Sequence, residues 1–482
     1  MLPLEFSIDI ETVGDLWPMG RAPRLIPVDP SKFARVFEPA SLDANRKSLQ
    51  QLEKRLPREV YWRIQRSLGF LLRYGYHLFP GFACIYGELV NDEWLAMVDY
   101  HKDFHRDHII HQTQEALVVK RLFEEVQLSC TTHPLARQCR QAGWTQIGPS
   151  RRTVSLRELA AFVLATGDMR TRYVYEYAAA LGVPVALLEP ETEACYRFWY
   201  QVVYDAAITA ALYHDIGYPL QFLSNVASDI NRGRFTDLLQ GIDLGRVNAA
   251  FDDPLCLMPF RGHRSARQVG LSNAIREDID KAIVTALRGS HGLPGALTFL
   301  KLNHEVMDIR DGRRHAIGRL TLELAALAIA MHDAQGVYLG RKRSDERLRW
   351  TGRPMTPDRP RMRVAFRKDP VSYVMALADQ VQGYGRFNAV FGRAHPAIAG
   401  APDRTVTFDI DVCIAACRVA YRDDGSWLTI ASLFDSGHIQ DCARQHVRFD
   451  PDTRADFFDP QVGYLDSSGL FEQITVEAEV TP

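Results

Sequence analysis

The residues best suited to chemistry are the adjacent His214 and Asp215 in the segment Tyr213–Pro219. They follow a strongly apolar run, 206–212, that is typical of a helix. An imidazole beside a carboxylate is a mixed nitrogen and oxygen ligand pair that divalent metals accept. A purely structural alternative is a helix C-terminus, where His214 meets the last carbonyls and Pro219 ends the helix. The pair alone does not decide between these two interpretations.

A second group of candidate residues lies in the segment 94–123, which has no proline or glycine and a good helical period. His101, His105, His108 and His111 are spaced so that they share one side of the predicted helix, with His111 near the edge of the stripe. Four histidines on one side favour a polar or metal-lined face over an ordinary core.

Three further ligand-type residues lie on other apolar segments that the sequence predicts to be helical. His291 falls where a helix is interrupted by glycine and proline, His332 ends the apolar run 320–334, and Asp379 occupies an otherwise apolar helix. An ionised Asp379 or Asp215 in such surroundings would cost several kcal/mol unless it were paired or bound to a metal. These residues are therefore candidates for one shared site.

In chain order the candidates form the pattern H…HD…H…H…D. This pattern resembles the HD-domain superfamily of metal-dependent phosphohydrolases, which includes the HD-GYP phosphodiesterases and the cyclic nucleotide phosphodiesterases. The segments 106–112, 211–219, 291–296 and 377–380 are similar to the local motifs of that family. The resemblance spans roughly residues 95–390.

The resemblance implies two divalent metal ions. Its ligand sets are His111, His214, Asp215 and Asp379 for one metal, and the bridging Asp215 with His291 and His332 for the other. Two such cations lower the pKa of a bridging water and neutralise charge on a phosphoryl oxygen during in-line attack. Asp215 would thus be central to catalysis. Mn, Mg, Fe, Ni and Zn are not distinguished, because mixed sites of this kind accept several metals.

Two departures from the family pattern leave assignments open. About 100 residues separate His111 from His214, a much longer interval than in compact members, so His108 stays a rival first ligand and 124–190 is expected to pack outside the site. The lysine that usually follows the signature is absent, and Tyr218 is nearby instead. Candidates for phosphate recognition and for proton donation to the leaving oxygen complete the predicted site. These are Arg386, Arg288 and Tyr218 for substrate binding, and His105 and His108 for proton transfer.

Three functions follow from these patterns. The first is hydrolysis of a nucleotide or cyclic-nucleotide phosphoester, with phosphodiesters ahead of phosphomonoesters or deoxynucleoside triphosphates. The second is an HD-type nucleotide sensor or scaffold that signals without turnover. The third rests on Ser7–Thr12, which resembles the first motif of DnaQ-like exonucleases. The roughly 200 residues after it look helical rather than alternating, which favours a plain edge strand leading into a turn.

The predicted fold class is mainly α, with an HD-type helical bundle core, a helical N-terminal region and a small α/β or β-rich C-terminal module. The expected divisions are 1–93, 94–395 with an insertion at about 124–190, and 402–482. The last of these contains alternating β-branched and aromatic residues, and Asp423-Asp424-Gly425 marks a hairpin turn.

Composition limits the remaining possibilities. The chain has 482 residues and a net charge of -2, so no overall basic field suggests nucleic acid. No apolar run reaches about 18 residues, the length at which a membrane span is expected. The eight cysteines include no C-x-x-C pair, which favours buried reduced thiols in a cytoplasmic protein. The expected partner is a small phosphorylated substrate of the nucleotide class, and a homo-oligomer is allowed.

Overall fold

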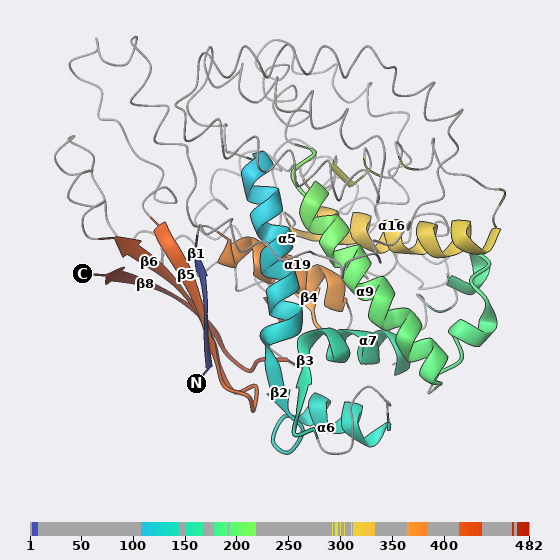
Figure 1. Cartoon of the computed structure of the whole chain (residues 1–482), viewed down its shortest axis with the longest axis horizontal. Coiled ribbons are helices and arrows are strands. Elements are labelled where there is room, and N and C mark those ends of the chain that lie inside the picture. The colour runs from blue at the N-terminus through green and yellow to red at the C-terminus, as the bar shows by residue number, and fades with distance from the viewer. Residues whose placement is uncertain are drawn as a thin grey trace, which may run out of the picture.

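The computed structural model is mostly helical over the part of the chain that it describes, with a small mixed sheet beside the helices (Figure 1). This confirms the predicted mainly α class with strands toward the C-terminus. The described residues are 2–7, 108–143, 151–166, 175, 178–190, 192–217, 292, 295–296, 299, 303, 310, 312–332, 364–367, 369–382, 414–435, 465–466 and 470–481.

The central element is α9 (Glu193–Tyr213). It begins at Thr192, whose hydroxyl accepts a hydrogen bond from the backbone N–H of Cys195, as an N-cap residue does. Every residue from Val202 to Tyr213 is buried, and a helix that is buried all round must lie in the middle of a core. Its neighbours are α5 (His108–Glu125), α7 (Leu156–Thr166), α16 (Gly312–His332) and α19 (Pro370–Val381).

Local capping signals fix the starts of two of these neighbours. Ser155 and Glu158 form a capping box at α7, in which each side chain accepts a hydrogen bond from the other residue's backbone N–H. At α19 the Asp369 carboxylate accepts from the N–H of Ser372, and Pro370 occupies the first turn, where a missing N–H costs nothing. The sequence therefore encodes the starts of α7 and α19 within a few residues.

The segment between α5 and α9 forms a small subassembly at the C-terminal end of α5 (Figure 1). The strand β2 (Gln127–Ser129) pairs antiparallel with β3 (Thr153–Ser155), and α6 (Pro134–Gln141) lies between them in sequence. A single 3-10 turn, η2 (Val185–Leu187), contacts α9. Buried residues of β2, α6, β3 and α7 belong to the same core as α9.

The sheet has the strand order β1-β5-β6-β8. A hairpin joins β5 (Ile414–Tyr421) to β6 (Leu428–Asp435), and β8 (Ile474–Thr481) runs parallel to β6. The turn contains Gly425 with a φ of 78°, so the hairpin predicted at Asp423-Asp424-Gly425 is confirmed. A short parallel pair, β4 (Val364–Ala365) with β7 (Leu465–Asp466), stands apart from this sheet.

The N-terminal strand β1 (Leu2–Ser7) pairs antiparallel with β5 at the edge of the same sheet. The first residues of the chain are thus part of a sheet whose other strands lie beyond residue 413. The exonuclease-like residues Asp9 and Glu11 lie outside the described residues.

The sheet packs on the helices rather than standing free of them. Val419, Leu428 and Ile430 belong to the same hydrophobic core as α9. The hydroxyl of Tyr421 donates to the backbone carbonyl of Glu125, 3.2 Å away, and accepts from the backbone N–H of Gln127 at 3.0 Å. These contacts anchor the sheet at the C-terminal end of α5.

The predicted helix 41–75 and residues 94–107 of the next predicted helix lie outside the described residues. Of the helices that the structure describes, none is both long and apolar enough to cross a membrane.

Four cysteines test the expectation of buried thiols. Cys130, Cys139, Cys195 and Cys417 are buried, and none forms a disulfide. Burial raises the pKa of the Cys195 thiol to about 11 and raises the pKa of Cys139 as well. Because the thiolate is the reactive form, we expect these four to resist an aromatic disulfide reagent at about pH 8 until the chain unfolds.

The measurement is a thiol count in buffer and in denaturant, with labelled positions mapped by mass spectrometry. The native chain should give at least four fewer thiols than the unfolded chain. Labelling of Cys195 before unfolding would contradict this prediction.

Candidate metal centre

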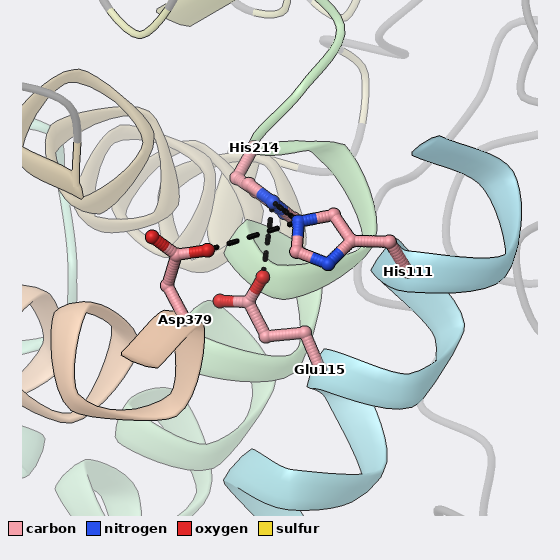
Figure 2. Close-up of side chains that lie close together, drawn as sticks. All are labelled: His111, Glu115, His214 and Asp379. Carbon is pink, nitrogen blue, oxygen red and sulfur yellow. Dashed lines mark hydrogen bonds and ion pairs between the residues drawn. The ribbon is translucent and has the colours of Figure 1, made fainter. Parts of the chain in front are cut away.

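Ligand-type side chains from four helices meet at one buried point. His111 comes from the first turn of α5, His214 and Asp215 follow the last residue of α9, His332 ends α16 and Asp379 lies near the end of α19. These five are among the six metal ligands that the sequence predicts, and groups of them lie close enough together to hold a metal ion. Figure 2 shows the side chains of His111, His214 and Asp379 converging.

The distances between the ligand atoms are short. His214 Nε2 lies 2.8 Å from His111 Nε2 and 3.3 Å from Asp215 Oδ1. The other oxygen of Asp215, Oδ2, is 3.3 Å from His111 Nε2. His332 Nε2 is 3.7 Å from Asp215 Oδ1, and Asp379 Oδ1 is 3.7 Å from His111 Nε2. Asp215 is therefore the residue that joins the α5 side of the cluster to the α16 side.

Two of the histidines are held in the orientation that a metal ligand needs. His214 Nδ1 donates to the carbonyl of Ala211 at 2.8 Å, and His332 Nδ1 donates to the carbonyl of Ile329 at 2.5 Å. A backbone carbonyl on Nδ1 fixes the proton there and directs Nε2 at the cluster. His214 is therefore both a residue that bonds a carbonyl at the end of its helix and a candidate metal ligand. One nitrogen bonds the helix end and the other faces the candidate metal site.

The spacing of these atoms fits a shared cation. Two ligands that are each about 2.1 Å from one ion, at angles of about 90–110°, lie about 3.0–3.4 Å apart. Among His111, His214 and Asp215 the separations are 2.8, 3.3 and 3.3 Å, near that interval, and Asp379 Oδ1 is farther away, at 3.7 Å from His111 Nε2. The residues present therefore suit a divalent ion in both donor type and spacing.

Glu115 is a member of the cluster that sequence reasoning missed. It lies one turn after His111 on α5, is fully buried, and places Oε2 3.0 Å from His214 Nε2 (Figure 2). The i, i+4 spacing of His111 and Glu115 was the available signal. It was weak, because glutamates on helices are usually solvated, as Glu124 and Glu125 at the other end of α5 are.

Gln382, the C-cap residue of α19, was also missed. Its side chain is buried, and Nε2 lies 3.2 Å from His111 Nε2 and 3.4 Å from the backbone carbonyl of Asp379. Within the described part of the chain its Oε1 has no hydrogen-bond partner. Gln382 therefore brings a carboxamide directly to the edge of the cluster.

The electrostatics of the cluster favour a cation. Burial raises the pKa of Glu115 to about 7, although His214 acts in the opposite direction. Burial lowers the pKa of His214, but Asp215 and Glu115 outweigh it and hold that pKa well above its usual value. Burial also lowers the pKa of His332, but the hydrogen bond to Asp215 and the negative charges of Asp379 and Asp215 together raise that pKa above its usual value. The carboxylates thus require positive charge at the histidine nitrogens, and a divalent cation can supply that charge.

The segment after His291 packs on the turn that carries His214 and Asp215. A side chain added at Gly295 would approach the backbone nitrogen of Gly217 to 3.1 Å, so the two backbones are in close contact. The ring of Phe299 contacts the ring of Tyr213 in a tilted arrangement, with centroids 5.0 Å apart. His291 itself lies outside the described residues.

Most of the other predicted site residues also fall outside the described part of the chain. His108 begins α5, but its side chain is among those not described, so only His111 is placed in the cluster. The others outside are His105, Tyr218, Arg288 and Arg386.

Comparison with known proteins adds nothing to this geometry. No family model, no curated protein and no solved structure matches the chain. The candidate site therefore rests on a buried group of His, Asp and Glu side chains that could hold metal ions.

Proposed function

We propose that this chain is a metal-dependent phosphohydrolase that acts on a nucleotide or cyclic-nucleotide phosphoester. Phosphodiester hydrolysis is the leading reaction, ahead of phosphomonoester or deoxynucleoside triphosphate hydrolysis. The observation that carries the proposal is the convergence of His111, His214, Asp215, His332 and Asp379 from four separate helices. Their order and local motifs resemble those of the HD-domain superfamily.

In this proposal His111, His214, Asp215 and Asp379 hold one cation, and Asp215, His332 and His291 hold a second. Asp215 would be shared by the two cations, because Oδ2 is near His111, and Oδ1 is near both His214 and His332. His214 would hold only one cation, because Nδ1 is engaged by Ala211 and Nε2 has a single lone pair.

Two divalent cations bound by this set supply a water of lowered pKa and neutralise charge on the phosphoryl group. The protein side chains bind and orient the substrate. Arg288, Arg386 and Tyr218 are the proposed phosphate contacts, and His105 or His108 is the proposed proton donor to the leaving oxygen.

The experiment that tests this function combines elemental analysis with hydrolysis of a generic phosphodiester in added Mn²⁺. We expect about two metal ions per chain, and hydrolysis that is lost on chelation and restored by Mn²⁺. Bound metal without turnover on any phosphoester would favour the nucleotide sensor. A chain that binds no divalent metal would overturn the proposed function.

Asp379→Ala should affect mainly the cation held with His111 and His214. Asp379 Oδ1 lies 3.7 Å from His111 Nε2, on the α5 side of the cluster. His332 Nε2, on the α16 side, instead lies 3.7 Å from Asp215 Oδ1. We expect the variant to keep about one of two metal ions, because the cation held with His111 and His214 should bind more weakly by more than the roughly 10- to 100-fold that loss of an outer-shell partner costs. Elemental analysis after dialysis measures this, and unchanged metal content would remove Asp379 from the ligand set.

A further inference from the structure

Glu115 occupies an unusual place relative to His214. A carboxylate that merely orients a metal-binding histidine bonds the ring nitrogen opposite the metal. In His214 that nitrogen is Nδ1, and the carbonyl of Ala211 already accepts its proton. Glu115 instead lies 3.0 Å from Nε2, the nitrogen that faces the cluster. Its position is that of a second ligand of the same cation.

The surroundings of Glu115 offer its carboxylate little else. The residue is fully buried, and within the described part of the chain neither oxygen has a neighbour other than His214 to bond. A buried carboxylate costs several kcal/mol unless it is paired, hydrogen-bonded or bound to a metal. Figure 2 shows the carboxylate of Glu115 directed at the point where His111, His214 and Asp379 meet.

We propose that Glu115 is a direct ligand of the cation held by His111, His214 and Asp379, and that it makes this the stronger of two unequal metal sites. This inference rests on the proposed function, because it assigns ligands within the same centre. Glu115, His111, His214 and Asp379 each offer one ligand atom, and these atoms all lie within 4.8 Å of one another.

The inequality follows from the charges. His214 Nε2 can serve one cation, and its shortest distances, to His111 and Glu115, assign it to the α5 side. That site then has Glu115 and Asp379 in addition to a shared Asp215. On the α16 side, the described ligands are His332 and the shared Asp215. More carboxylates attract a divalent ion more strongly, so the first site fills before the second.

The donor set also indicates the class of metal. Two imidazoles with two carboxylates, a third shared carboxylate and no thiolate suit Mn²⁺ or Fe²⁺, which accept both nitrogen and oxygen ligands. Mn²⁺ is therefore the probe for the test.

The test is calorimetric titration of Mn²⁺ into the chelator-treated full-length chain. The unmodified chain should show two separate binding phases. Glu115→Gln keeps the shape of the side chain but removes its charge. The tighter phase should weaken by more than the roughly 10- to 100-fold that loss of an outer-shell partner costs, so that the two phases approach each other. His332→Ala should instead lose the weaker phase and keep the tighter one.

Glu158→Gln is the matched control. Glu158 is another buried glutamate in the same core, but it caps α7 through Ser155 and is outside the cluster. Its variant should bind Mn²⁺ like the unmodified chain. Circular dichroism checks that each variant is folded. If Glu115→Gln is not folded, Glu115→Asp keeps the charge, withdraws it by one methylene group, and should show an intermediate loss.

A second measurement examines the ligands themselves. One equivalent of Co²⁺ should occupy the stronger site, and its visible absorption reports the number and type of ligands. The spectrum should change in Glu115→Gln and stay unchanged in Glu158→Gln.

The outcomes separate this inference from the proposed function. Two Mn²⁺ phases of unchanged affinity in a folded Glu115→Gln variant would overturn the role of Glu115 and leave the metal centre standing. An equal loss of Mn²⁺ affinity in Glu158→Gln would also overturn the role of Glu115, because the loss would then come from altered packing of the core. Absence of any Mn²⁺ binding by the unmodified chain would overturn the metal centre itself.

Discussion

Asp215→Ala is expected to lose both metal ions and, with them, phosphoester hydrolysis by on the order of 10³-fold or more. The reason is geometric. Its Oδ2 lies 3.3 Å from His111 and its Oδ1 lies 3.3 Å from His214 and 3.7 Å from His332. No other described carboxylate is within ion-pair distance of histidines on both sides of the cluster. The change follows the last turn of α9, so the packing of that helix should survive.

Elemental analysis and phosphodiester hydrolysis measure the effect, with Asp205→Ala as the matched control. Asp205 is a buried aspartate of the same helix, and Gln201 Nε2 lies 2.8 Å from both of its oxygens. Its variant should keep both metals even if its stability falls. Wild-type metal content in Asp215→Ala would show that the site assignment is wrong. Loss of hydrolysis in Asp9→Ala with retention in Asp215→Ala would instead favour the exonuclease-like motif.

The parts of the fold that sequence predicts best are those whose causes are local. The apolar run before His214, the capping residue Thr192 and the Asp-Asp-Gly turn each act within a few residues. α9 and the β5–β6 hairpin are therefore predictable almost from their own sequences.

The pairing of strands that are far apart in the chain has no comparable local signal in the sequence. The pairing of Leu4 with Val419 in β1 and β5 joins the two ends of the chain. Period-2 alternation indicates a strand but does not name its partner. An N-terminal strand that joins a C-terminal sheet was therefore not predicted.

The candidate site shows the same division between local and distant causes. His and Asp residues on apolar helices can be recognised from the sequence, because a polar side chain there needs a partner. His111 and Asp379 are predicted as metal ligands on this basis. Glu115 and Gln382 were missed because their spacing is also that of solvated residues. What distinguishes them is burial, and burial depends on the packing of α5 and α19 against α9.

Gly425→Ala is expected to lower the free energy of unfolding more than alanine does at a positive-φ glycine that has open space around it. Gly425 has a φ of 78°, a conformation that costs about 1–2 kcal/mol for a residue with a Cβ. An added Cβ would also lie 2.3 Å from the ring of His133 and 2.6 Å from the carbonyl oxygen of Leu470. The free energy of unfolding should fall by about 2–5 kcal/mol in total.

Neither neighbour can easily move away. His133 Nδ1 accepts from the backbone N–H of Ala136 as the N-cap of α6, and Nε2 donates to the carbonyl of Leu470 at 2.8 Å. The backbone of Gly425 is itself fixed, because its carbonyl accepts from the N–H of Glu472. The added methyl group must therefore break the contact between the hairpin turn and α6, or strain it.

Gly143→Ala is the control that isolates this contact. Gly143 has a similar φ of 73°, but nothing lies within 4 Å of the position that its Cβ would take. The free energy of unfolding of this variant should fall only by the cost of the positive φ, about 1–2 kcal/mol. Chemical denaturation of both variants gives the difference, which is the free energy of the clash at His133. Equal losses in the two variants would mean that the hairpin turn can withdraw from α6 at no cost, and that the sheet is not fixed to the helical core at this point.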